Sequence, residues 1–124
     1  MNLVDSCGWL EYFTGGPNAG FYSAPLQRLE RLVVPTICIL EVYKRVTQQR
    51  GEDAALQAVA LMHQGIVVDL DAALAITVAK ISGGLRLPLA DSVVLATARE
   101  YGAVIWTQDS DFAGMPGGNY KKKK

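Results

Sequence analysis

Short, continuous apolar runs alternate with longer amphipathic segments along the 124 residues of the chain. A continuous apolar run of about four to eight residues predicts a strand that is buried on both faces. The longer segments place apolar residues three or four positions apart, which is typical of helices with one buried face. We therefore expect strands at residues 1–5, 31–35, 66–70 and 103–107, and helices at 6–13, 21–32, 36–50, 52–65, 72–84 and 87–101.

Turn and cap residues mark the ends of several of these helices. Gly51 and Gly102 each follow a helical segment, and Asp71 precedes one, where its side chain can cap the first turn. The stretch 111–120 is rich in turn residues, although a short edge strand could lie within it. A single domain over residues 1–120 is expected, because no linker or repeat divides the chain.

Strands separated by helices imply a mainly parallel sheet of four or five strands, covered by helices on both faces. The predicted fold class is therefore α/β. In such sheets ligands bind at the carboxyl ends of the strands, so functional residues are expected at that edge.

The net charge of zero hides an uneven distribution. The chain has 12 basic and 12 acidic residues, but four of the basic ones form the run Lys121–Lys124. Without this run the domain is acidic, which argues against a simple electrostatic nucleic-acid binder. The run at 121–124 is expected to be a disordered tail; a purification artefact and an RNA-attracting arm are the alternatives.

Several classes of protein are disfavoured by what the sequence contains. No apolar run approaches the roughly 20 residues of a membrane span. Asp5 comes too early for a signal peptide, so we expect a cytoplasmic protein without membrane contact. Cys7 and Cys38 lack the spacing of a zinc site, and the only histidine, His63, lies in a helical segment. Buried thiols and a structural or surface histidine are the simpler interpretations.

Four acids that are distant in sequence, and a fifth that lies close to one of them, are expected near the same edge of the sheet. Asp5 closes the first predicted strand and Asp109 follows the fourth, with Asp111 two residues further on. Glu41 and Asp91 lie in the first turns of helices that start from this edge. The carboxyl ends of parallel strands meet at one side of a sheet, so these carboxylates can converge there.

The apolar neighbours of Glu41 and Asp91 favour a metal site. A lone carboxylate in such surroundings is costly unless it is paired, protonated or bound to a metal. Mg²⁺ and Mn²⁺ prefer oxygen-only ligands of this kind, and such an ion can activate a water molecule against a phosphodiester. A divalent ion would also bridge an acidic protein to a polyanionic substrate.

Each of these residues also has a purely structural interpretation. Helix capping, pairing with Arg45 and stabilisation of a helix dipole would explain Asp5, Glu41 and Asp91, respectively. The remaining residues are common in turns or bind nearby backbone groups: Asp109, Asp111, Ser6 and Thr107. A shared site is favoured, because all of these explanations would otherwise have to hold together on one edge.

Four stretches of the sequence, in order and spacing, resemble the PIN-domain family. They are "NLVDSCGWLEYF", "VPTICILEVYKR", "LPLADSVVLATAREYGAVIWTQDSDF" and "GMPG", and together they extend from residue 2 to about residue 120. More narrowly, they look like the VapC-type toxins of bacterial toxin–antitoxin pairs. The resemblance implies a three-layer α/β/α sandwich and a Mg²⁺- or Mn²⁺-dependent endoribonuclease that is inhibited by a cognate antitoxin protein.

The resemblance also assigns roles to individual residues. The four acids of the family fall on Asp5, Glu41, Asp91 and Asp109. The supporting positions are a more variable acid and two small hydroxyl residues, which fall on Asp111, Ser6 and Thr107. Cys7 departs from the pattern, since a small or hydroxyl residue is expected there, and it would make the site oxidisable.

The expected mechanism uses a metal-activated water to cleave RNA. Asp5, Asp91 and Asp109 would hold one or two ions, and Glu41 would be a ligand or would orient the water. Three basic residues near the site, Lys44, Arg45 and Arg86, would touch RNA phosphates, although surface solvation is the alternative for them.

Members of the family commonly form homodimers, and the helices expected at 17–32 and 35–50 are candidate dimer surfaces because they are expected to carry exposed aromatic and aliphatic residues. Two other functions remain open. A receiver-like phosphoacceptor would share a small acidic Mg²⁺ pocket, but no Lys lies between Lys80 and the run 121–124 to meet the phosphoryl group. A non-catalytic PIN-like interaction module is the other alternative.

Overall fold

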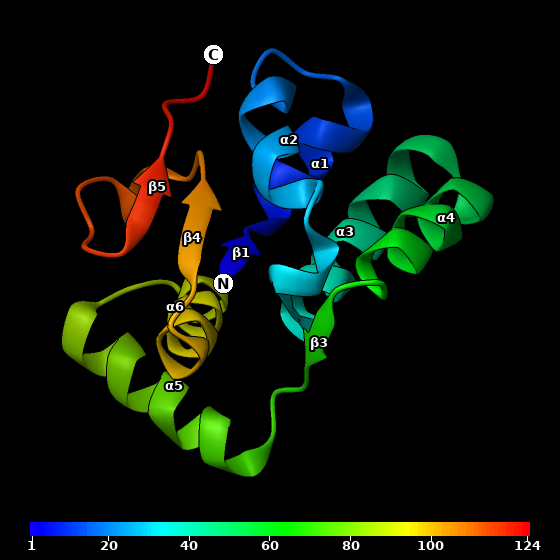
Figure 1. The fold of residues 1–124 in the computed structure, drawn as a ribbon. Coiled ribbons are helices and arrows are strands. Elements are labelled where there is room, and N and C mark those ends of the chain that lie inside the picture. Colours follow the sequence, from blue (N-terminus) through cyan, green and yellow to red (C-terminus); the bar gives the residue numbers. More distant parts are fainter.

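A computed structural model describes residues 1–124 as a five-stranded sheet packed against six α-helices (Figure 1). The strands are β1 (Asn2–Val4), β2 (Leu32–Pro35), β3 (Ile66–Val68), β4 (Val104–Thr107) and β5 (Gly118–Tyr120). The helices are α1 (Ser6–Thr14), α2 (Ala19–Leu26), α3 (Thr36–Arg50), α4 (Glu52–Met62), α5 (Ala72–Leu85) and α6 (Leu89–Tyr101), with short 3-10 helices η1 (Leu29–Arg31) and η2 (Ser110–Phe112). The predicted α/β class with a sheet of four or five strands is confirmed.

The strands are ordered β3-β2-β1-β4-β5, and every neighbouring pair is parallel. The chain moves in one direction from β1 through β2 to β3, and then crosses back to β4 on the other side of β1. Right-handed crossovers place α1–α4 on one face of the sheet and α5 and α6 on the other. Figure 1 shows α5 and α6 grouped apart from α1–α4. Because β2 and β3 lie on one side of β1, and β4 and β5 on the other, the direction in which strands are added reverses between β1 and β4.

The central strands are buried on both faces, which explains their continuous apolar sequences. Leu3, Val33 and Val34 are inaccessible to solvent, and Ile105 of β4 is 2% exposed. Helices cover both faces, so strands in this position need apolar side chains at successive residues. The edge strands β3 and β5 are less buried and have three residues each.

Two segments differ from the predicted elements. The helix predicted at 21–32 is wrong in its length: α2 ends at Leu26, a separate turn forms η1, and Leu32 already belongs to β2. The backbone leaves the helical conformation at Arg28 (φ −126°, ψ 67°), and Leu32 is fully buried as the first residue of β2, so burial in the sheet outweighs the helical spacing of the leucines. The turn-rich stretch 111–120 contains the possible edge strand, since β5 pairs with β4 in parallel through Ile105 and Gly118.

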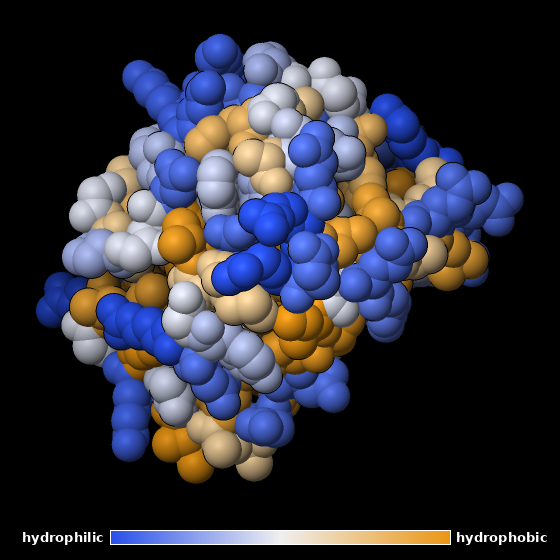
Figure 2. All heavy atoms as spheres, viewed as in Figure 1, coloured by the Kyte–Doolittle hydropathy of each residue, from blue (hydrophilic) through white to orange (hydrophobic).

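The surface mixes polar and apolar side chains, as Figure 2 shows for one face. Segment 17–32 was expected to expose aromatic and aliphatic residues, and it does so only in part: Tyr22, Leu26 and Leu32 are buried, whereas Phe21 and Leu29 are partly exposed. Leu89 of α6, Ile76 of α5 and Leu40 of α3 are the most exposed large apolar residues, at 69%, 60% and 57%. No single helix combines the length and the apolar character of a membrane span, and only the sharply bent pair α5–α6 passes that test jointly.

Candidate active site

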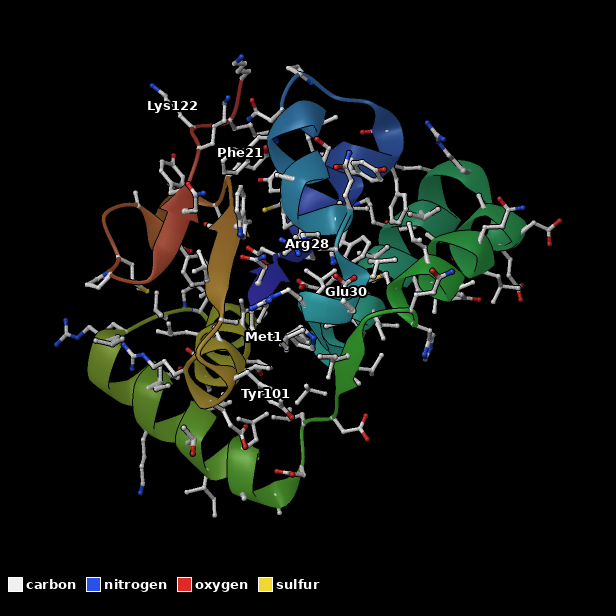
Figure 3. All side chains as sticks on the ribbon, in the orientation of Figure 1. Met1, Phe21, Arg28, Glu30, Tyr101 and Lys122 are labelled. Carbon is white, nitrogen blue, oxygen red and sulfur yellow. The ribbon has the colours of Figure 1, made fainter.

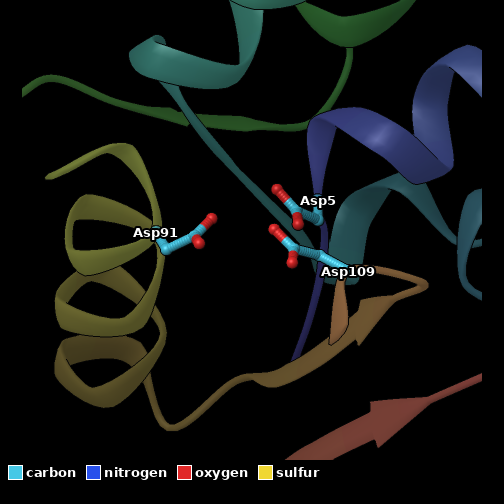
Figure 4. Close-up of side chains that lie close together, drawn as sticks. All are labelled: Asp5, Asp91 and Asp109. Carbon is cyan, nitrogen blue, oxygen red and sulfur yellow. The ribbon is translucent and has the colours of Figure 1, made fainter. Parts of the chain in front are cut away.

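Three carboxylates converge where the strand order reverses. Asp5 directly follows β1, and Asp109 lies two residues beyond β4, the neighbouring strand. Asp91 lies in the first turn of α6, which approaches from the other face of the sheet. The side chains point toward one another (Figure 4), and one carboxylate oxygen from each of the three lies within 4.8 Å of the other two. Ligands of open α/β sheets bind at this kind of reversal point.

Asp5 is fixed in place by two hydrogen bonds. The backbone N–H of Ser6 donates to Oδ1 at 2.8 Å, so Asp5 caps α1. The hydroxyl of Thr107 donates to Oδ2 at 3.0 Å. The capping interpretation and the site interpretation are therefore compatible, because each carboxylate oxygen has its own donor.

Thr107 also positions the second acid. Its hydroxyl oxygen accepts a hydrogen bond at 2.9 Å from the backbone N–H of Asp109. The Asp109 side chain accepts in turn from the N–H of Asp111 at 2.9 Å and caps η2. One buried hydroxyl at the end of β4 thus links the carboxylates of two neighbouring strands.

Glu41 lies at the margin of the cluster and does not belong to the set of three. Its Oε1 accepts a hydrogen bond from the hydroxyl of Ser6 at 3.0 Å, and Ser6 is the residue that donates to Asp5. Glu41 makes no salt bridge with Arg45, so the pairing that would have given Glu41 a purely structural role is not observed. Ser6 therefore connects Glu41 to the three aspartates.

Burial and mutual repulsion raise the pKa values of the clustered acids. Burial is the main cause of the raised pKa of Asp5, and the negative charges of Asp109 and Glu41 add to it against the hydrogen bonds from Thr107 and Ser6. Burial also raises the pKa of Asp91 to about 8, with further contributions from the nearby carboxyls of Asp111 and Asp109.

The donor set fits a hard divalent cation. The only salt bridge in the structure joins Arg28 to Glu30 at 3.8 Å on exposed side chains, so no Lys or Arg neutralises the aspartates. Three carboxylates held this close without a cation repel one another and disfavour the ionised state. Oxygen-only ligands at this spacing suit Mg²⁺ or Mn²⁺.

Cys7 contributes a protonated thiol to the site. Its Sγ lies 3.6 Å from Asp5 Oδ2 and 3.5 Å from Thr107 Oγ1. Burial, followed by the charge of Asp5, raises the pKa of this thiol to about 12. The thiolate is the species that reacts with oxidants, so this environment argues against the oxidisable site expected from the sequence. Cys38 is fully buried, and burial also raises its pKa.

The three predicted RNA-binding residues lie in different places. Arg45 and Lys44 of α3 line a cavity of about 380 Å³ together with Glu41. Arg45 also lines a second cavity, of about 300 Å³, that reaches Cys7. Arg86 ends α5 with a positive φ of 55° and lines neither cavity.

A buried amide pair beside the site was not found by sequence reasoning. The Nδ2 of Asn18 donates to Oε1 of Gln108 at 3.1 Å, and both residues are buried. Asn18 lies in a turn-rich stretch and Gln108 follows a strand, where amides are common and carry no spacing signal. Only the fold brings these two residues together.

The protein is a parallel α/β domain with an acidic centre at the carboxyl ends of β1 and β4, as its strand order and its three clustered aspartates show. The chain belongs to the PIN-domain family, whose profile matches residues 3–118. The predicted family is therefore confirmed. Receiver domains have the strand order 2-1-3-4-5, and the order here differs from it, so the receiver-like alternative is wrong.

Solved structures of similar fold include several toxin proteins. The chain resembles a toxin–antitoxin complex from Klebsiella pneumoniae (TM-score 0.80, 21% identity, 96% of each chain covered). It also resembles VapC20 of Mycobacterium tuberculosis, a Sarcin-Ricin loop cleaving toxin (TM-score 0.78, 16% identity, 94% of this chain and 95% of that chain). A DNA-bound VapBC from Salmonella typhimurium aligns with a TM-score of 0.75 at 18% identity, over 98% of each chain. No curated protein sequence matches the chain significantly.

Proposed function

We propose that the protein is a divalent-metal-dependent endoribonuclease that acts as the toxin of a toxin–antitoxin pair. The observation that carries the proposal is the convergence of Asp5, Asp91 and Asp109 within 4.8 Å without a neutralising side chain. Membership of the PIN family and the likeness to a toxin that cleaves the Sarcin-Ricin loop support RNA as the substrate.

Asp5, Asp91 and Asp109 would hold Mg²⁺ or Mn²⁺, with Asp111 as a supporting acid. Such an ion supplies positive charge to a phosphoryl transition state and makes a nearby water more acidic. Thr107 keeps Asp5 and Asp109 in register by its two hydrogen bonds. These residues therefore position the ion, while the substrate is bound by other groups.

Glu41 is the best-placed group to orient the attacking water and to take its proton. It is held by Ser6, it lies outside the trio, and it faces a cavity that also presents Lys44 and Arg45. A general base needs this combination of a fixed position and access to substrate. Lys44 and Arg45 would bind RNA phosphates, and Arg86 is a weaker candidate because of its separate location.

The partners follow from the same proposal. The similar structure from Klebsiella pneumoniae is a toxin–antitoxin complex, and the one from Salmonella typhimurium is a DNA-bound VapBC; this likeness supports a cognate antitoxin for this chain. An entirely apolar cavity of about 420 Å³, lined in part by Ile37, Leu70 and Leu89, is a candidate surface for a homodimer. The cytoplasm is the proposed location, since the RNA substrate is found there.

Replacing Glu41 by Gln is expected to lower the rate of RNA cleavage about a hundredfold, because the amide cannot accept the proton of the water. Purified wild-type protein should cleave single-stranded RNA with Mn²⁺, lose activity in EDTA and recover it when Mn²⁺ is restored. In bacteria, expression of the wild type should arrest growth, whereas Glu41→Gln should not.

Glu52→Gln is the matched control, because Glu52 is an exposed acid at the start of α4. It should cleave RNA and arrest growth like the wild type. Undiminished cleavage in EDTA would contradict the metal-dependent mechanism, and full activity of Glu41→Gln would remove this residue from it.

A further inference from the structure

The basic run Lys121–Lys124 does not leave the domain directly after β5. The N–H of Lys121 donates to the carbonyl oxygen of Thr107 at 2.9 Å, which continues the pairing of β5 with β4. The carbonyl oxygen of Lys122 then accepts a hydrogen bond from Nδ2 of Asn18 at 3.1 Å. The first two lysines of the run are therefore attached to the domain by their backbone.

Asn18 is an unusual anchor because it is almost fully buried, at 1% exposure. Its Nδ2 donates both to Lys122 and to Gln108, and its own N–H donates to Oε2 of Glu11 at 2.8 Å. A buried amide with these partners has little freedom to move, because each lost hydrogen bond would leave a buried polar group unsatisfied. The position of the run is thus set by the core next to the active site.

Side-chain contacts reinforce this arrangement. The ammonium group of Lys121 lies over the ring of Phe21, 5.6 Å from its centroid, which is within the range of a cation–π interaction. Figure 3 shows Lys122 and Phe21 at the same end of the molecule. Lys121 and Lys122 therefore lie beside the start of α2.

The consequence is a positively charged wall beside the carboxylates. Lys123 lines the cavity of about 300 Å³ that also contains Arg45, Gln108 and Cys7. Cys7 contacts Asp5, so this cavity adjoins the candidate active site. Glu11 lies in the same wall, but its carboxylate accepts from the backbone of Asn18. Neither Lys123 nor Arg45 forms a salt bridge, which leaves both cations free for a ligand.

We propose that the Asn18-anchored run, through Lys123 and with Arg45 opposite, forms a binding subsite for a backbone phosphate of the RNA strand next to the aspartate trio. This proposal rests on the ribonuclease function above. An acidic domain needs local positive charge to hold a polyanion, and single-stranded RNA binds to such cationic grooves mainly through its phosphates. Lys123 directly follows the anchored Lys122, so its position is restricted, whereas a loose basic tail would give only general attraction.

The test compares two neighbouring lysines of the same run. Binding of a fluorescent single-stranded RNA is measured by anisotropy in EDTA, where no cleavage is expected, over a series of salt concentrations. Lys123→Gln should weaken binding about fivefold at about 0.1 M salt and reduce the salt slope by about 0.7, as expected for one lost phosphate contact. Lys124→Gln removes the same charge without a position in the cavity and should change the affinity less than about twofold.

Asn18→Ala separates anchoring from charge. It removes no charge, and it should weaken RNA binding about as much as Lys123→Gln if the anchor sets the position of the run. Thermal melts check that this variant is folded; if it is not, the comparison of Lys123 with Lys124 decides alone. Lys80→Gln, an exposed lysine on α5, is the remote control and should bind like the wild type.

Equal losses for Lys123→Gln and Lys124→Gln would overturn the proposal in favour of a loose basic tail. Binding of polyglutamate with the same dependence on Lys123, but no binding of RNA, would overturn it in favour of an acidic protein partner. A wild-type protein that binds RNA through Lys123 but does not cleave it with Mn²⁺ would refute the ribonuclease proposal and leave the phosphate subsite in place.

Discussion

Replacing Asp109 by Asn is expected to reduce the rate of Mn²⁺-dependent RNA cleavage by about a thousandfold. The amide keeps the shape of the side chain and can still accept the hydrogen bond from Asp111, so the backbone at the end of β4 should be undisturbed. What changes is the charge available to a divalent ion. The measurement is the initial rate of cleavage of a labelled RNA at saturating Mn²⁺, with the variant and the wild type at equal concentration.

Two other Asp→Asn variants serve as comparisons for the loss of activity in Asp109→Asn. Asp111→Asn should reduce the rate only about tenfold, because this exposed acid acts from outside the trio. Asp69→Asn replaces an exposed acid after β3 and should have no effect. Equal activity of Asp109→Asn and the Asp69 control would show that Asp109 has no part in the chemistry.

Asp91→Asn is expected to stabilise the metal-free protein while abolishing its response to metal. The pKa of Asp91 is raised from its ordinary value of 3.8 to about 8, mainly by burial and then by the neighbouring carboxyls of Asp111 and Asp109. The folded protein therefore holds a proton that the unfolded chain releases, and stability falls as the pH rises from about 4 to about 8. Asparagine does not ionise, so it avoids this loss.

Melting curves at two pH values test this expectation. In EDTA at about pH 8, Asp91→Asn should melt about 4–8 °C above the wild type, for a gain of about 1–2 kcal/mol. At about pH 3, below the ordinary pKa of 3.8, the acid is mostly protonated in both the folded and the unfolded state, so the difference should nearly disappear. Mn²⁺ at about 100 times its dissociation constant should stabilise the wild type by about 2.7 kcal/mol and leave the variant unchanged. A variant that melts below the wild type at both pH values would contradict the repulsion on which this prediction depends.

The sheet and the position of the acids could be predicted because both follow from local patterns. Continuous apolar runs mark the central strands, and parallel strands bring their carboxyl ends to one edge regardless of the distance in sequence. Asp5, Asp91 and Asp109 could therefore be placed near one another before any coordinates, although the reversal of strand order between β1 and β4 could not be foreseen.

Other features depend on tertiary contacts that leave no local pattern. The residues of β5 are rich in glycine and turn formers, and their pairing with β4 is set by the neighbouring strand rather than by their own propensity. The predicted helix at 21–32 followed the spacing of its leucines, but the burial of Leu32 in the sheet determined the outcome. The contact of Asn18 with Lys122 spans 104 positions and involves a backbone carbonyl, which no side-chain pattern records.

The most direct test of the carboxylate site is to locate Mn²⁺ by anomalous diffraction from crystals of the wild-type protein grown with the ion. We expect an anomalous peak bounded by the side chains of Asp5, Asp91 and Asp109, and no peak there in crystals of Asp109→Asn. An absence of anomalous density among these three aspartates in the wild type, or a peak only elsewhere on the molecule, would contradict the role of these residues as a metal centre.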